Sequence, residues 1–466
     1  MNTDSRRTWR GWVTPLLALS LALAAYGADG AANAGGDGDD LSDEAVAVAE
    51  AAGLDPDFDW RRFEGTDLLV MAGQHPWPDT LAPMVDEFEE LTGIDVTFEQ
   101  LPVPEMRQRI LVEMVGGSDN IDVFMSSDQQ DASLFHANGW YEPLNRYLDS
   151  DEFVADGFDF DDFGAGLIET VTIDGDIISL PILVEIAILY YRGDVFEEAG
   201  VEFPPADLAA YEEALAAVDD PGGRRALAAR GESAQAVTQF AGILYNFGGD
   251  FLDDEGNAAI DTPEAIEAFD YYGRIIREYG LPGSVNNSAE ESQSAMQADQ
   301  AVVMHDASAF LQNLSDPEIS LFADEIRYTA IPAGPGGSYQ TTFGWGLALS
   351  ALSQNQDAGW YFIQWATSPG VVQRVQDEGV IGGRQSTQFP DAMPDDFVEA
   401  LQTGLTEDAR SQLPPVRAVP EARDIIGQVI VAAIQGDDIE SAAQSANEQL
   451  QELIDSEVDP EDLIDD

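Results

Sequence analysis

From Asp67 to Met125, short apolar strands alternate with amphipathic helices, and this alternation constrains the fold more than any other feature of the chain. Strands are predicted at residues 67–73, 94–100 and 121–125. Between them, apolar side chains recur at helical spacing over residues 81–91 and 106–114, and glycines end both helices. Such a series predicts a mostly parallel sheet flanked by helices. In sheets of this type, ligands bind outside the carboxyl ends of the strands.

A second α/β region follows a long apolar strand, residues 178–191, that is interrupted only by Glu185. Downstream, the pattern predicts helices at 208–218, 236–247, 263–279, 307–314, 356–366, 424–434 and 439–454, and strands at 301–306 and 345–350. The chain has 466 residues, more than one hydrophobic core usually spans. We therefore expect two domains.

The charge of the chain is extreme: 88 acidic side chains stand against 20 basic ones, all of them arginine, for a net charge of −68. This balance argues against nucleic acid or an anionic membrane as a partner. In molar salt the Debye length falls to about 3 Å and the self-repulsion is screened. We interpret the acidity as an adaptation to a hypersaline medium, because a hydrophobic content of 44% argues against a disordered chain.

Residues 1–34 are predicted to be a signal peptide, with the positive segment "SRRTWR" followed by an uncharged stretch. The paired arginines leave the general and twin-arginine export routes open. Tyr26 stands where a lipoprotein signal needs cysteine, so cleavage near residues 32–34 and retention as an anchor are both open. Residues 35–62 are predicted to be an acidic, Gly/Asp-rich tether. The absence of cysteine means that disulfides do not reveal the redox compartment.

A series of short motifs, in order, resembles the extracellular solute-binding proteins of ABC importers, specifically the carbohydrate-binding, maltose-binding-protein-like group. The motifs are "FEELTGIDVTFE", "IDVFMSSDQQ", "GWYEPL", "LPILVEIAILYYRGDVFEEAGV", "YNFGGDFLDDEGN", "AVVMHD", "FGWGLALSALSQNQDAGWYFIQWATSP" and "IVAAIQGDDIESAAQSANEQLQELI". They extend from about Asp67 to about Ser456. One departure is the helix that follows Ala206, which lacks the "P-x-T-W" start usual in that family.

The resemblance implies a two-lobed α/β fold of the periplasmic-binding-protein type. Each lobe would hold a mostly parallel sheet flanked by helices, and strand-like hinge crossovers would connect them. By that analogy, residues 63–184 and 349–390 form an N-terminal lobe, and residues 190–342 and 394–466 form a C-terminal lobe. The ligand would lie in the cleft between the lobes, and closure would be a hinge motion.

Trp345 is the first candidate for ligand contact, because the C–H faces of a sugar stack on aromatic rings. Its neighbours Gly344 and Gly346 would let backbone and ligand approach closely. The alternative is an aromatic side chain packed under a loop. Trp360 and Trp365 lie at helical spacing and are predicted to be core.

Glu185 is the second candidate, because a carboxylate in an apolar strand needs a partner or a polar cleft. The resemblance aligns it with a carboxylate that binds sugar hydroxyls, whereas a structural hydrogen bond is the alternative. Tyr190 and Tyr191 alternate in direction, so one of them would line the cleft.

Further candidates lie in loops at predicted strand ends or where the family places cleft residues. They are Gln74, His75, Trp77, Asp128, Gln129, Gln130, Phe247, Gly248, Asp250, Asp306, Arg384 and Arg423. A solvated turn is the alternative for the loop residues, and a salt bridge to one of the many carboxylates is the simpler explanation for Arg423.

Enzymatic activity is not expected. The chain lacks the sequence signatures of zinc proteases, P-loops and nucleophile elbows, and its three histidines have no metal-ligand spacing, so no cofactor is predicted. With 88 acidic residues, paired carboxylates of a glycoside hydrolase would arise by chance. A different ligand, such as glycerol-3-phosphate or a peptide, is the other alternative. Phosphate would require an arginine cluster, for which only Arg384 and Arg423 are candidates.

The sequence therefore predicts an exported receptor, acting as a monomer outside the cytoplasmic membrane. It would deliver a sugar, oligosaccharide or polyol to the permease subunits of an ABC transporter.

Overall fold

The computed structural model describes residues 41–391, 393–405 and 409–457. The predicted signal peptide, residues 1–34, and the start of the predicted tether lie outside these ranges. Within them, the first strands and helices alternate as the sequence predicts: β1 (Asp67–Gly73), α2 (Pro76–Leu81), α3 (Val85–Thr92), β2 (Asp95–Leu101), α4 (Val103–Gly116) and β3 (Val123–Ser127). Strand β1 pairs in parallel with both β2 and β3. The carboxyl ends of these strands therefore meet at one edge, where the loops at residues 74–75 and 128–131 begin.

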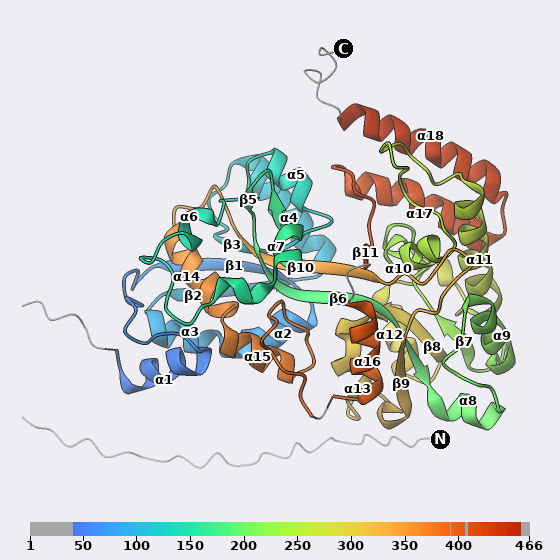
Figure 1. Ribbon diagram of the computed structural model, residues 1–466, viewed down its shortest axis with the longest axis horizontal. Coiled ribbons are helices and arrows are strands. Elements are labelled where there is room, and N and C mark those ends of the chain that lie inside the picture. Colours follow the sequence, from blue (N-terminus) through green and yellow to red (C-terminus); the bar gives the residue numbers. More distant parts are fainter. Residues whose placement is uncertain (1–40, 392, 406–408, 458–466) are drawn as a thin grey trace, which may run out of the picture. The chain divides into compact units, whose positions relative to one another are not determined.

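Two long strands, β6 (Leu180–Arg192) and β10 (Thr341–Leu349), hold the sheet together (Figure 1). They pair antiparallel with each other, and the strand order is β2-β1-β3-β10-β6-β8-β7. Strand β10 also pairs antiparallel with β3, and β6 pairs antiparallel with β8 and β9. The pairs β1–β2, β1–β3 and β7–β8 are parallel, as predicted, whereas the two long central strands run antiparallel to their neighbours.

Strands β1, β2 and β3 form a first group on one side of β6 and β10. The strands on the other side, with their helices, form a second α/β group. Its strands are β7 (Arg225–Ala228), β8 (Ala301–Ala307) and β9 (Ile326–Ala330). Its helices are α8 (Gly193–Ala199), α9 (Leu208–Val218), α10 (Ser233–Asn246), α11 (Pro263–Tyr279), α12 (Ala289–Gln297), α13 (Leu311–Ser315), α16 (Asp395–Gly404), α17 (Val419–Gln435) and α18 (Ile439–Glu457). Strands β7 and β8 are parallel, so their carboxyl ends also lie at one edge.

The remaining elements are short or belong to the first group. They are α5 (Ala132–Ala137), α6 (Asn145–Leu148), α7 (Ala165–Thr170), β4 (Thr172–Ile173), β5 (Asp176–Ile177), α14 (Gln356–Ala366), α15 (Pro369–Asp377) and β11 (Arg410–Ser411). Single 3-10 turns lie at Ala82–Met84, Phe160–Phe163, Ser284–Asn286, Ser308–Phe310 and Ala323–Glu325. Trp360 and Trp365 on α14 are fully buried, which confirms that they belong to the core.

The predicted tether is wrong for residues 41–62. Helix α1 (Asp43–Ala52) begins at Ser42, whose side chain accepts a hydrogen bond from the Ala45 backbone N–H. Alanines on one face of α1 are buried, and the helix packs against α3 and α15. Trp60 is also fully buried. The segment is acidic overall, and its buried face is a short stripe of alanines. Because alanine is only weakly apolar, a hydropathy pattern does not reveal this face.

Helices α10, α11, α17 and α18 pack closely, and glycines set the approach of three of them. A Cβ on Gly273 of α11 would lie 2.4 Å from backbone and side-chain atoms of Ala433 on α17. A Cβ on Gly427 of α17 would lie 2.3 Å from the Ser233 carbonyl oxygen at the start of α10. These contacts leave no room for a methyl group, so the helix backbones are in direct contact at these glycines.

We expect Gly273→Ala to reduce the free energy of unfolding by about 1–3 kcal/mol, because the added methyl forces α11 and α17 apart. The measurement is urea unfolding in molar KCl. Gly116→Ala, in the last turn of α4, is the control, since a Cβ there meets nothing within 4 Å. Equal losses in the two variants would contradict the close helix contact.

Candidate functional site

The carboxyl ends of parallel strands in both groups bring polar side chains to the middle of the sheet. His75 follows β1, Asp128 follows β3, Arg230 follows β7, and Asp306 lies near the end of β8. The central strands add Glu185 from β6 and Trp345 from β10. This placement agrees with the general location of ligand sites in α/β sheets.

Trp345 and Glu185 meet because of the register of β6 and β10. Trp345 pairs with Leu183, so Glu185 is its diagonal neighbour on the same face. The Trp345 indole Nε1 donates a hydrogen bond to Glu185 Oε2 at 3.2 Å. The other carboxylate oxygen, Oε1, lies 3.2 Å from His75 Nε2. Two strand side chains, Glu185 and Trp345, and His75 from the loop after β1 thus form one hydrogen-bonded set.

Glu185 is 6% exposed, and Trp345 is 5% exposed. Burial acts to raise the pKa of the Glu185 carboxyl, but the charge and hydrogen bond of His75 outweigh it. Arg230 and the Trp345 N–H add to the lowering, so the pKa lies below its usual value. Glu185 is therefore a buried carboxylate held in its charged form, an acceptor suited to hydroxyl groups.

The glycines that flank Trp345 serve protein contacts rather than ligand approach, which corrects the prediction. A Cβ on Gly344 would lie 2.4 Å from Asp128 Oδ2, and one on Gly346 would lie 2.4 Å from Ser179 Oγ. The space that a side chain would fill is already taken by these neighbours. The register shift between Trp345 and Gly346 occurs at the same place.

Arg107 on α4 lies against the indole of Trp345, with its guanidinium carbon 4.8 Å from the ring centroid. Its Nε donates to Asp131 Oδ1 at 3.1 Å, and its Nη2 is buried without a hydrogen-bond partner among the described residues. The sequence analysis missed Arg107. A signal was present, because Arg107 lies three residues before Ile110, on the apolar face of the helix.

The loop after β3 is ordered by contacts on several sides. Asp128 Oδ1 accepts the Gly344 backbone N–H at 3.2 Å, and burial raises the pKa of Asp128 to about 6. Gln129 Nε2 donates to the Thr342 carbonyl oxygen at 2.8 Å, and its Oε1 accepts from Ser411 Oγ at 2.9 Å. Gln130 Oε1 accepts from Arg423 Nη1 at 2.6 Å. The loop therefore connects β3 to β10 and to α17.

Asp306 is fully buried and its oxygens are occupied. Arg230 Nε donates to Oδ2 at 3.1 Å, Gln239 Nε2 donates to Oδ1 at 3.2 Å, and the Ala307 N–H also donates to Oδ1. In this conformation Asp306 positions Arg230 instead of offering a free carboxylate. Arg230 itself was not predicted, because the sequence pattern of the short strand β7 was not recognised.

Arg423 is 8% exposed and forms no ion pair with a carboxylate in the described ranges, which overturns the predicted salt bridge. Its donors reach neutral acceptors: the Ala234 carbonyl oxygen at 2.8 Å, Gln130 Oε1 and Thr238 Oγ1 at 3.2 Å. Burial lowers the pKa of Arg423 to about 9, and the charges of Arg107 and Arg230 add to this lowering.

Arg384 was predicted to lie in the cleft. In the structure it forms contacts within the first group instead. It donates to the Thr367 carbonyl oxygen at 2.6 Å and pairs with Asp162 at 3.2 Å. Its guanidinium also covers the Phe163 ring at 4.3 Å. All its partners belong to segments around α7 and α14, so it holds these together.

Several other predicted residues have structural partners of their own. Trp77 is 1% exposed in the core, and the Tyr190 hydroxyl donates to the Ala307 carbonyl oxygen at 2.7 Å. Asp250 pairs with Arg410, and Phe247 and Gly248 end helix α10. Gln74 is exposed next to His75. Burial in the core explains Trp77, and burial with a backbone hydrogen bond explains Tyr190.

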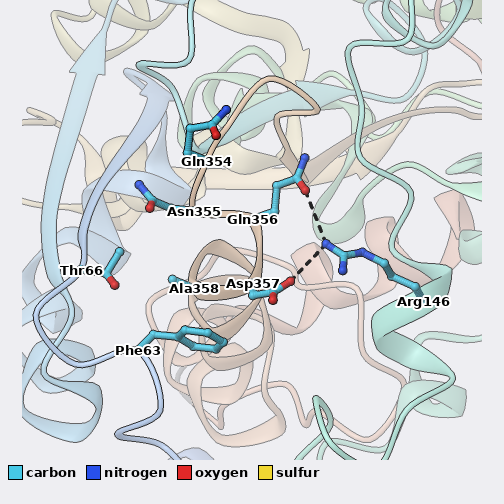
Figure 2. A pocket seen from close by; sticks show the side chains of 8 residues that line it. All are labelled: Phe63, Thr66, Arg146, Gln354, Asn355, Gln356, Asp357 and Ala358. Carbon is cyan, nitrogen blue, oxygen red and sulfur yellow. Dashed lines mark hydrogen bonds and ion pairs between the residues drawn. The ribbon is translucent and has the colours of Figure 1, made fainter.

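A separate hollow lies at the amino-terminal end of β1, away from the strand ends that carry His75 and Asp128. It has a volume of about 310 Å³ and is lined by Phe63, Thr66, Arg146 and the start of α14 (Figure 2). Arg146 pairs with Asp357 at 3.1 Å across it. In the described part of the chain, no group of three or more acidic or histidine side chains is arranged to hold a metal ion.

The fold and the site define an α/β binding protein with a buried polar centre where strand ends converge. Residues 74–373 match the family described as bacterial extracellular solute-binding protein. The chain belongs to this family, which confirms the predicted class of protein and fold, and makes it a solute-binding protein rather than an enzyme. No helix in the described residues is long and apolar enough to cross a membrane.

Curated relatives and solved structures agree with this assignment. The chain is 25% identical to an erythritol/L-threitol-binding protein of Mycolicibacterium smegmatis, over 69% of this chain and 71% of that protein. It is 27% identical to a mannitol-binding protein of Pseudomonas aeruginosa, over 60% and 65% of the two chains. A ribitol complex of an ABC transporter solute-binding protein from Agrobacterium radiobacter K84 superposes with a TM-score of 0.75 at 22% identity, covering 84% of this chain and 99% of the other.

We expect Asp128→Asn to stabilise the unliganded protein above pH 6, because burial disfavours the charged carboxylate and the amide oxygen still accepts the Gly344 N–H. The gain in the free energy of unfolding should be on the order of 1 kcal/mol after allowance for solvent screening. It should shrink as the pH falls from about 6 towards 3.8, the ordinary pKa of an aspartate side chain. Below that pH, Asp128 is protonated in both the folded and unfolded states, so the difference vanishes.

Thermal unfolding of both proteins between pH 4 and pH 8 in molar KCl measures this difference. Asp254→Asn, at an exposed position, is the matched control. A stability difference that grows as the pH falls would contradict the assigned direction.

Proposed function

We propose that the protein is the substrate-binding receptor of an ABC transporter, and that it captures a sugar, oligosaccharide or polyol between the two α/β groups. The observation that carries the proposal is the hydrogen-bonded set of Trp345, Glu185 and His75 at the converging strand ends. An indole ring offers a face to C–H groups, and a buried carboxylate offers strong acceptors to hydroxyl groups. Relatives named for erythritol, threitol and mannitol support a polyhydroxylated ligand.

Ligand entry requires motion, because the site is almost sealed: Trp345, Glu185 and Arg423 are each less than 9% exposed. Hydrogen bonds from Ser411 to Gln129 and from Arg423 to Gln130 join the segment of β11 and α17 to the loop after β3. We assign β6 and β10 as the hinge strands of two lobes, with residues 63–184 and 349–390 in one and 190–342 and 394–466 in the other. Opening would break these hydrogen bonds, and ligand contacts to both lobes would favour closure.

The protein is proposed to act outside the cytoplasmic membrane, and its membership of a family described as extracellular supports this location. Residues 1–34 would direct export, and the receptor would pass its ligand as a monomer to a membrane permease. The net charge of −68 supports a salt-adapted protein.

We expect a panel of polyols, monosaccharides and oligosaccharides to contain at least one ligand that raises the melting temperature. A ligand present at 100 times its Kd stabilises the folded state by about 2.7 kcal/mol. The measurement is a thermal-shift screen in molar KCl. If peptides stabilised the protein, and neither this panel nor acidic derivatives of its sugars and polyols did, the ligand class proposed here would be wrong.

For the strongest ligand of that panel, we expect Glu185→Gln to weaken binding at least tenfold, because a charged acceptor becomes neutral at nearly constant shape. Titration calorimetry gives the affinity, and Glu197→Gln, exposed on α8, is the control. Unchanged affinity in the Glu185 variant would remove this carboxylate from ligand binding.

We expect the free energy of unfolding to rise between 0.1 M and 2 M KCl, as the Debye length falls from about 10 Å to below 3 Å and carboxylate repulsion is screened. Urea unfolding at each salt concentration measures this change. Sucrose at equal osmolality is the control, because it stabilises by exclusion without screening charge. A flat salt series, or an equal rise in sucrose, would contradict the assignment of the acidity to salt adaptation.

A further inference from the structure

We infer that Arg107 and Arg423 bind an anionic group of the ligand, so that the captured solute is an acidic sugar or acidic polyol rather than a neutral one. The inference rests on the proposed function and names its ligand class. Basic side chains are scarce, since the whole chain has 20 of them. Even so, the charges of Arg107 and Arg230 both act on Arg423, and Arg107 also lies over Trp345.

Arg423 is a buried cation, and none of the described carboxylates lies within ion-pair distance of it. Its three donor nitrogens are fixed by the Ala234 carbonyl oxygen, Gln130 and Thr238, which are all neutral. Glu232 and Asp131 act on it only through longer-range charge. The chain has 88 acidic residues, so a carboxylate would be the expected partner for Arg423. A buried charge left without one is costly, and an anion from outside would remove that cost.

Arg107 provides a donor that is ready for such an anion. Its Nε is engaged by Asp131, whereas its Nη2 is buried and has no partner among the described residues. The guanidinium lies over Trp345, so the unused donor is beside the indole proposed to contact the ligand. The adjacent residues Gln130 and Asp131 hold Arg423 and Arg107 respectively, which ties both guanidinium groups to one loop.

The acidic side chains of the site are committed to other partners. Asp131 pairs with Arg107, and Asp306 pairs with Arg230. Glu185 is held by His75 and by the Trp345 N–H, and Asp128 accepts the Gly344 N–H. After these pairings, Arg423 is the one arginine of the three that has no contacting carboxylate among the described residues. Guanidinium groups bind carboxylate and phosphate oxygens through paired N–H donors, so both anions share the required chemistry.

The test compares matched ligands that differ in one group. Each alditol of a panel, comprising erythritol, ribitol, mannitol and sorbitol, is measured beside the corresponding aldonate, in which a terminal CH₂OH is a carboxylate. Alditol phosphates form a third arm, which separates carboxylate from phosphate as the source of the charge. Titration calorimetry of the full-length protein in 1 M KCl gives the affinities.

We expect the preferred aldonate or alditol phosphate to bind at least tenfold more tightly than its neutral alditol, as charge-assisted hydrogen bonds require. Arg107→Gln should reduce this preference to about twofold or less. Arg423→Gln should have the same effect. If the Arg423 variant does not fold, Arg107→Gln alone tests the inference. Arg146→Gln, at the separate hollow of Figure 2, is the control and should keep the full preference.

Neutral alditols that bind as tightly as their acids would overturn the inference and leave the proposed function standing. A preference for acids that survives both arginine substitutions would also overturn it, because another site would then bind the anion. No binding by any member of the three sets, or of the wider panel above, would overturn the proposed function together with this inference.

Discussion

The antiparallel pairing of β6 with β10 is the interaction on which the rest of the structure depends. These strands are the only direct strand-to-strand link, within the described ranges, between β1–β3 and β7–β9. Their register also brings Glu185 diagonally opposite Trp345. A shift by one residue would turn Trp345 to the other face and separate it from the carboxylate. The same backbone pairing therefore builds the sheet and assembles the site.

Charge imposes the second constraint on this protein. With few cations available, most arginines neutralise carboxylates or fix local structure, as Arg384 does when it ties residues 159–163 to the end of α14. Arg423 differs, because its partners are neutral and its surroundings hold two further arginines. Burying a cation next to like charges is unfavourable, and ligand-binding sites commonly contain groups with such unfavourable electrostatics.

Much of the fold was predictable because its helices and strands have strong apolar periodicity. Helices α9, α11 and α14 have the predicted bounds, and the strand that contains Glu185 was recognised as a long central element. The alanine-rich α1 and the four-residue β7 escaped prediction, because neither contains enough bulky apolar side chains to set a period. Within the site, Glu185 attracted attention as a charge in an apolar strand. Arg107 is likewise a charged residue on an apolar face, but it lies on a helix. Three apolar residues at helical spacing already accounted for that face, so Arg107 was not singled out.

The sequence by itself determined the α/β class, the core tryptophans of α14 and the central position of Glu185, because these follow from periodicity and from the cost of burying a charge. Tertiary structure alone decided which side chains share a site. Arg107, Asp131 and Trp345 are separated by as many as 238 positions and meet only through strand order and register. It likewise decided that Arg384 fixes the scaffold whereas Arg423 contacts the loop after β3, since the two are chemically identical and differ only in their neighbours.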